Sequence, residues 1–243
     1  MGMCVLLGFL LIRELPVMKA KALLPDRAQV KQMIRFSIVM LTASATSQVM
    51  SYNETFIVGQ LLQDEELLAE YRVAANILSI SLFLLEALLV FILPYFIQHI
   101  RDKKWIWENY KKLFVINGAV MSALHLGLIV FAKLYLYIFA GPEYMGAAPL
   151  VRMFLIASWI QAVFRGISGN ILAVTGEEKF NLKINIVFVV VHAVIDVAAV
   201  KLLGIYGAAI ALIAVYLLSG LIMNIHLRNS CKSQIGEIKH DEE

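Results

Sequence analysis

The chain is short of charged residues. Aspartate, glutamate, lysine and arginine together make up 16% of its 243 residues, whereas a soluble domain carries about 25%. Hydrophobic residues make up 60%, and the mean hydropathy is +0.78. A protein with so little charge has too little polar surface to face water over most of its area. The composition therefore predicts a membrane protein and excludes most soluble classes.

Cysteine is scarce as well, and the residue patterns of common active sites are missing. The two cysteines, Cys4 and Cys231, stand near opposite ends of the chain, which excludes a disulfide framework and a paired-cysteine metal site. No HExxH, G-x-S-x-G or phosphate-binding glycine loop occurs. The net charge of +3 is too small to indicate nucleic-acid binding. We therefore expect neither an enzyme nor a metal site, and no cofactor or nucleic-acid partner.

What the sequence does contain is a series of long apolar segments. A membrane-spanning helix needs roughly 20 apolar residues, and six segments reach that length: 36–62, 73–98, 113–139, 149–175, 182–203 and 206–227. An apolar stretch at 3–12 is too short to span. We expect an all-α, polytopic membrane protein in four parts. These are the end of a preceding transmembrane helix at 1–13, a basic linker at 14–35, a six-helix lobe at 36–227 and a polar tail at 228–243.

The basic residues predict how this lobe is oriented. Sixteen lysines and arginines fall in the 14–35 linker with the adjoining Arg13, in the 228–243 tail and in the two connections on the same side, and three fall in the opposite connections. Because basic loops stay on the cytoplasmic side of a bilayer, the linker and the C-terminus are predicted to be cytoplasmic. We expect a multi-pass protein of the cell inner membrane.

Ionisable and amide side chains interrupt five of the predicted spans. An ionised group at the centre of a span costs about 2.5–3.5 kcal/mol on the insertion scale. Smaller polar residues flank these groups at helical spacing, which indicates polar faces turned toward a shared wet cavity. The candidates for substrate binding or coupling are Asn53 and Glu54 in the first span, Glu86 in the second, His125 in the third, Gln161 and Arg165 in the fourth, and His192 and Asp196 in the fifth.

A purely structural role is the alternative for each candidate. His125 would then donate a hydrogen bond between helices, and Arg165 would form an ion pair with Asp196 or Glu86. A patch of small residues, which includes Gly204 and Gly207, predicts a tight turn followed by close helix packing.

Several motifs resemble those of one transporter family. YNETFIVGQLLQDEELLAEYRVAANI has an acidic residue before I-x-G, and LLVFILPYF ends a helix in a proline. IFAGPEYMGAAPLVRMFLIASWI and GNILAVTGEEKFNLKINIVFVVVHAVIDVAAVKLLGIYGAAIA follow in the same order and at the same spacing as in that family. Together they resemble the C-terminal half of Wzx-type O-antigen and capsule polysaccharide flippases. That family belongs to the superfamily that also holds the MATE antiporters and the MurJ-type lipid II flippases.

The resemblance implies one lobe of a two-lobed, MATE-like transporter. Such a protein would translocate a lipid-diphosphate-linked oligosaccharide across the inner membrane by alternating access, and the second lobe would be a missing N-terminal lobe or a second copy of the chain. The partial helix at 1–13 would then end the first lobe. Arg165 would attract the diphosphate, because a guanidinium matches phosphate geometry. Glu54, Glu86, His192 and Asp196 would serve gating or ion coupling.

Other functions remain open at this point. A MATE-like, cation-coupled extruder of drugs would suit the acidic Glu54 and Glu86. A six-helix chain is also compatible with a non-transporting membrane fragment or scaffold. A membrane-embedded enzyme ranks last, because no catalytic constellation is present. One departure from the family pattern bears on coupling: His192 and Asp196 stand where the family tends to have asparagines.

Overall fold

The computed structural model describes residues 55–241, with side chains as far as 232, and eight isolated residues between 26 and 41. The chain divides into two compact units, Met1–Met40 and Leu41–Glu243. The described residues from 27 to 38, in the first unit, are helical. Residues 1–13, most of the first predicted span, and the candidates Asn53 and Glu54 lie outside the described residues.

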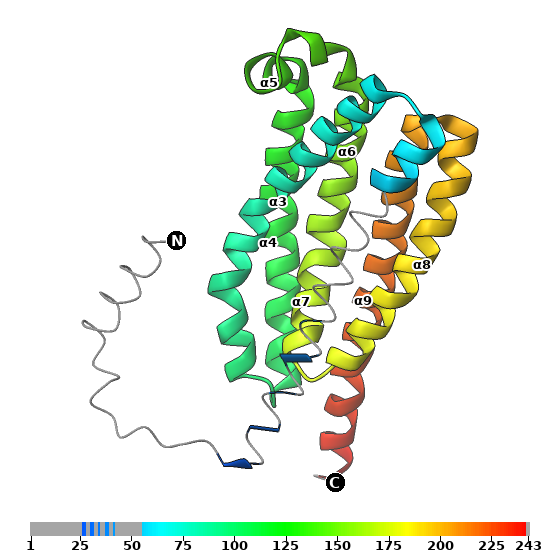
Figure 1. Ribbon diagram of the computed structural model, residues 1–243. Coiled ribbons are helices and arrows are strands. Elements are labelled where there is room, and N and C mark those ends of the chain that lie inside the picture. The colour runs from blue at the N-terminus through cyan, green and yellow to red at the C-terminus, as the bar shows by residue number, and fades with distance from the viewer. Residues whose placement is uncertain are drawn as a thin grey trace. The chain divides into compact units, whose positions relative to one another are not determined.

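The described part of the second unit is helical throughout (Figure 1). After a helical stretch at 55–62, its elements are α3 (Glu65–Gln98), α4 (Lys103–Val130), α5 (Ala132–Phe139), the 3₁₀ turn η2 (Pro142–Ala147), α6 (Ala148–Ile160), the π-helical turn η3 (Gln161–Gly166), α7 (Ile167–Val174), α8 (Glu178–Leu203) and α9 (Ile205–Asp241). Five stretches are long and apolar enough to span a membrane. They match the second to sixth predicted spans, which confirms an all-α, polytopic membrane protein.

The third predicted span was wrong in its outer part. The sequence predicted one helix over 113–139, but α4 ends at Val130 and α5 begins at Ala132. Phe131, between them, leaves the helical conformation (φ −92°, ψ 15°). Helix α5 buries Ala132 and Leu136 and contacts α6 and η2. Apolar residues continue across this break, so the hydropathy of the sequence does not distinguish two successive helices from one continuous helix.

The stretch α6–η3–α7 forms the core of the described bundle. In its apolar window 61% of the residues are buried, against 22% in α4 and α8 and 28% in α3. Helix α9, which contacts α4, α6, η3, α7 and α8, is intermediate at 50%. Helices α3, α4 and α8 therefore present most of their apolar side chains outward, as helices exposed to lipid do.

Helices α8 and α9 form a tight hairpin. Gly204 joins them with a positive φ of 61°, a conformation that favours glycine. Three residues later, a Cβ atom added to Gly207 would lie 2.1 Å from the carbonyl oxygen of Ala199. These two glycines confirm the predicted tight turn and close packing, and they hold the buried face of α8 against α9.

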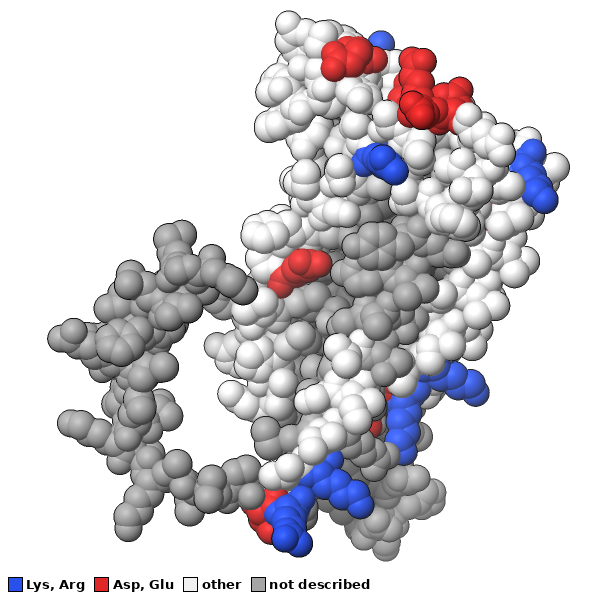
Figure 2. Space-filling view, viewed as in Figure 1, with Lys and Arg blue, Asp and Glu red and all other residues white. Residues whose placement is uncertain are grey.

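Most charged side chains visible in Figure 2 lie toward the two ends of the bundle, and one acidic side chain lies between them. Figure 2 shows one group of acidic side chains at the end where α3 begins and a group of basic side chains at the opposite end. Asp64 begins α3 by accepting hydrogen bonds from the backbone N–H groups of Glu66 and Leu67, and Asp102 caps α4 through Trp105. The apolar spans lie between these two charged ends.

Candidate functional site

A π-helical turn interrupts the central helix at Gln161–Gly166. A π turn holds one more residue than an α turn and is frequently found at functional sites. Two predicted candidates, Gln161 and Arg165, belong to this turn. The side-chain oxygen of Gln161 is buried and has no hydrogen-bond partner among the described residues.

Arg165 is partly buried and has only neutral contacts there. Its Nη2 donates to Oδ1 of Asn185 on α8 at 2.8 Å, and its guanidinium lies 5.5 Å from the centre of the Tyr216 ring on α9. In residues 55–232 no carboxylate lies within ion-pair distance of it. The structural alternative, an ion pair with Asp196 or Glu86, was therefore wrong. The positive charge remains available to an anion.

His192 and Asp196 lie one turn apart on the buried face of α8. Their exposed fractions are 1% and 0%, and neither ring nitrogen nor carboxylate oxygen has a hydrogen-bond partner within the described part of the chain. Arg165 hydrogen-bonds Asn185, which lies two turns before His192 on the same helix. Burying a carboxylate without a partner is costly. A bound proton or cation would remove that cost, so the pair is equipped to take one up.

His125 lies elsewhere and is fully hydrogen-bonded. Its Nδ1 is 2.8 Å from the carbonyl oxygen of Met121, and its Nε2 is 3.1 Å from the hydroxyl of Ser158 on α6. Ser158 in turn bonds Ser81 on α3. His125 thus joins α4 to α6 and, through Ser158, to α3, which is the structural role given above as its alternative.

Glu86 is exposed on α3 and, within the described bundle, forms no ion pair with Arg165. The preceding residue, Leu85, packs against Gly166 of η3. Gln161 and Arg165 share η3, and Arg165 bonds α8, whose buried face carries His192 and Asp196. His125 bonds Ser158 on α6 instead, and Glu86 is exposed.

Sequence reasoning missed several residues of this site. Tyr216, which stacks on Arg165, reads in the sequence as one more aromatic residue of an apolar span. Asn117 and Asn224 each donate to a backbone carbonyl of η3, at 3.1 Å and 2.6 Å. Both asparagines could have been identified as candidates from the sequence, since each is a lone amide within a long apolar run.

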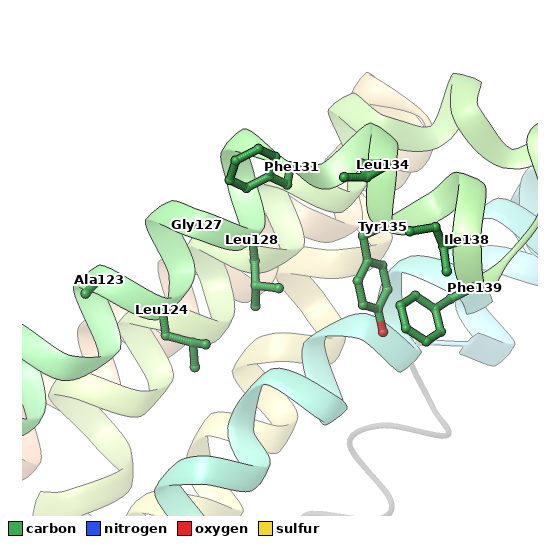
Figure 3. A pocket seen from close by; sticks show the side chains of 9 residues that line it. All are labelled: Ala123, Leu124, Gly127, Leu128, Phe131, Leu134, Tyr135, Ile138 and Phe139. Atoms are coloured by element: carbon green, nitrogen blue, oxygen red, sulfur yellow. The ribbon is translucent and has the colours of Figure 1, made fainter.

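The apolar groove in Figure 3 is a different feature. It has a volume of about 430 Å³, lies in the bend between α4 and α5, and is lined by aliphatic and aromatic side chains such as Leu128 and Phe139. None of the candidate residues lines it. In the described residues, no three histidine, cysteine, aspartate or glutamate side chains are placed to hold a metal ion.

A second polar cluster joins the start of α8 to α9. Glu177 accepts hydrogen bonds from His226 at 3.0 Å and from Ser230 at 2.5 Å. The ring of Phe180 stacks on His226 with 3.5 Å between the ring centres. The bonds from Ser230 and then from His226 lower the pKa of Glu177 below its ordinary value of 4.5. Glu177 lies in the connection between α7 and α8, outside the apolar spans.

Comparison with known proteins identifies one family. A family model described as "polysaccharide biosynthesis protein" matches residues 17–149, which is more than half of the chain. Searches of curated proteins and of solved structures found no match. The matched range ends within α6, so η3 and α8, with Arg165, His192 and Asp196, lie beyond it.

Proposed function

We propose, from the premise that this chain belongs to the family of polysaccharide biosynthesis proteins, that it translocates a lipid-linked oligosaccharide across the cell inner membrane. The sugar–diphosphate head would pass through a polar cavity while the lipid tail stays in the bilayer. The observation that carries this proposal is Arg165, a cation inside a membrane span whose guanidinium hydrogen-bonds Asn185, lies over the Tyr216 ring and has no ion-pair partner among the described residues.

The contacts of Arg165 suit an anion-binding role. An intramembrane charge is costly and marks a substrate pathway more often than a packing contact. A carboxylate partner would cancel its field, but an amide oxygen and an aromatic ring orient the guanidinium and leave its charge in place. The guanidinium has further N–H donors beyond the one bonded to Asn185, and these can hold two phosphate oxygens at once.

The remaining candidates fit a coupling or gating role. His192 and Asp196 supply titratable groups near Arg165, and a proton or cation bound there would favour one access state of the lobe. Glu86 is exposed on an apolar helix, where it would face a second lobe, either an N-terminal lobe or another copy of the chain. Glu54 and Asn53 would line the same pathway. The linker and C-terminus are assigned to the cytoplasm by the sixteen basic residues on their side.

Replacing Arg165 by alanine tests the proposal. In cells that depend on this protein, R165A should abolish surface polysaccharide and accumulate the lipid-linked precursor, because the diphosphate loses its cation. R165K, which keeps the charge but loses the planar donor pair, should retain part of the activity. Membrane abundance of both variants is the control. Wild-type levels of surface polysaccharide in cells with R165A would contradict the assignment of Arg165 to diphosphate binding.

A MATE-like, cation-coupled extruder of drugs is the second candidate. The exposed Glu86 carboxylate in an apolar helix is the observation that favours it, since an acidic group would attract cationic compounds. A deletion strain separates the two functions. Raised sensitivity to cationic drugs with normal surface polysaccharide supports extrusion, and the reverse pattern supports lipid-linked oligosaccharide transport.

A further inference from the structure

The π turn at η3 leaves backbone groups that need partners. In its wide turn the i→i+4 hydrogen bonds are replaced by i→i+5 bonds, and several carbonyl groups are left able to accept further bonds. Water satisfies such groups in a soluble protein, but the interior of a bilayer offers none. Side chains must therefore supply the donors.

Ser168 and Asn170 of α7 donate to the carbonyl oxygens of Phe164 and Gly166, both at 2.8 Å. Two asparagines from neighbouring helices also donate to the turn. Asn117 of α4 donates to the carbonyl oxygen of Ala162 at 3.1 Å. Asn224 of α9 donates to that of Phe164 at 2.6 Å, and its own Oδ1 accepts from the hydroxyl of Tyr110 on α4. The turn is thus held from both α4 and α9.

Helix α9 also touches the backbone of the turn. A Cβ atom added to Gly220 would lie 2.9 Å from both the carbonyl carbon and the Cβ of Phe164. Gly220 and Asn224 are one helical turn apart, so they meet η3 from the same face of α9. This face contacts the residue that directly precedes Arg165.

The extra residue of the turn sets the direction of Arg165. Each residue of an α-helix turns the chain by about 100°, so one added residue rotates everything after it by that amount. The rotation lets α6 pack against α3 while Arg165 reaches Asn185 on α8. A turn that relaxed to an uninterrupted α-helix would point the guanidinium elsewhere.

We propose that Asn117 and Asn224 are positioning residues for Arg165: by holding the π turn open, they aim its guanidinium at the site where an anionic phosphate group binds. This inference rests on the proposed function and adds to it the residues that orient the cation. Tyr110 contributes to the same positioning, because its hydroxyl donates to the side-chain oxygen of Asn224 and fixes that amide.

The test is a double-mutant cycle in the full-length protein, purified in lipid nanodiscs, with farnesyl diphosphate as the binding probe. We expect R165A and N224L each to weaken binding about tenfold. N224L should have no further effect in an R165A background, because an asparagine that acts through Arg165 has nothing left to position. S219A is the matched control, since buried Ser219 on α9 donates only within its own helix, and it should bind as the wild type does.

The outcomes separate this inference from the function it rests on. Unchanged binding by R165A overturns the diphosphate assignment itself. Weak binding by R165A with normal binding by N224L overturns only the positioning role, as does an equal loss from N224L with and without Arg165. If N224L does not reach the membrane, Y110F decides, because it removes only the hydroxyl that fixes Asn224. A severalfold loss supports the role and unchanged affinity overturns it.

Discussion

The buried faces of α4 and α8 are alike in sequence but differ in bonding. Each face carries three polar side chains: Tyr110, Asn117 and His125 on α4, and Asn181, His192 and Asp196 on α8. On α4 every one of these side chains hydrogen-bonds to another helix, and only the Oδ1 atom of Asn117 has no partner among the described residues. On α8 the side-chain oxygen of Asn181 and all four polar side-chain atoms of His192 and Asp196 have no partner within the described residues.

This difference separates a structural role from a functional one. Polar groups that bond across helices repay part of the cost of burial and fix the helix arrangement. Groups left without partners lower stability, and proteins keep such groups chiefly where activity needs them. The face of α4 therefore organises the lobe, whereas the face of α8, beside Arg165, is the better candidate for binding a substrate or a coupling ion.

The largest effect is expected when the polar face of α8 is made apolar. We expect the double variant H192L/D196L to lose transport while its thermal stability rises, because replacing buried unpartnered charges by apolar side chains is often stabilising by about 1–4 kcal/mol. Precursor accumulation in cells and the melting temperature in detergent measure the two effects. A variant that is destabilised and still transports would show that the polar face of α8 has a structural role and no role in transport.

Removing a hydrogen-bond partner of the polar face of α4 should lower stability and leave transport unchanged. S158A removes the hydroxyl between His125 and Ser81 and leaves both without that bond. We expect a loss of about 1–3 kcal/mol in the free energy of unfolding, the cost of leaving buried polar groups unpaired. Transport per folded molecule should stay normal, and the ratio of polysaccharide to membrane abundance measures it. If transport falls further than abundance does, His125 has a role in the mechanism.

The smallest effect on stability is expected at the start of α8, where Glu177 accepts hydrogen bonds from His226 and Ser230 of α9. The pKa of this carboxyl is lowered in the folded protein, chiefly by Ser230, so its ionised form stabilises the fold above the ordinary value of 4.5. That stabilisation is lost as the pH falls through the lowered pKa. The melting temperature should drop between about pH 5 and pH 3, and E177Q should show a flatter profile. Identical profiles would exclude a contribution from Glu177.

Some of these features were predictable from the sequence and others were not. The five described spans and the glycine hairpin were predicted, because apolar length and small residues act locally. The break at Phe131 was not, since it lies inside a continuous apolar run. The π turn at η3 was not either, since Gln161 and Arg165 mark the place as polar but do not indicate an extra residue in the helix. Polar candidates could be placed in a span, but their spacing alone could not show whether they bond.

The sequence by itself therefore determined that this is a helical membrane protein with ionisable groups in its spans, because a bilayer imposes length and apolarity on each helix separately. Tertiary structure decided which of those groups are satisfied. Hydrogen bonds between helices depend on partners far apart in the chain, such as His125 with Ser158, and no periodicity within one helix encodes them. Only the packed bundle shows that α4 uses its polar groups to hold the lobe, while His192 and Asp196 on α8, the helix that Arg165 bonds, have no hydrogen-bond partner in the described part of the chain.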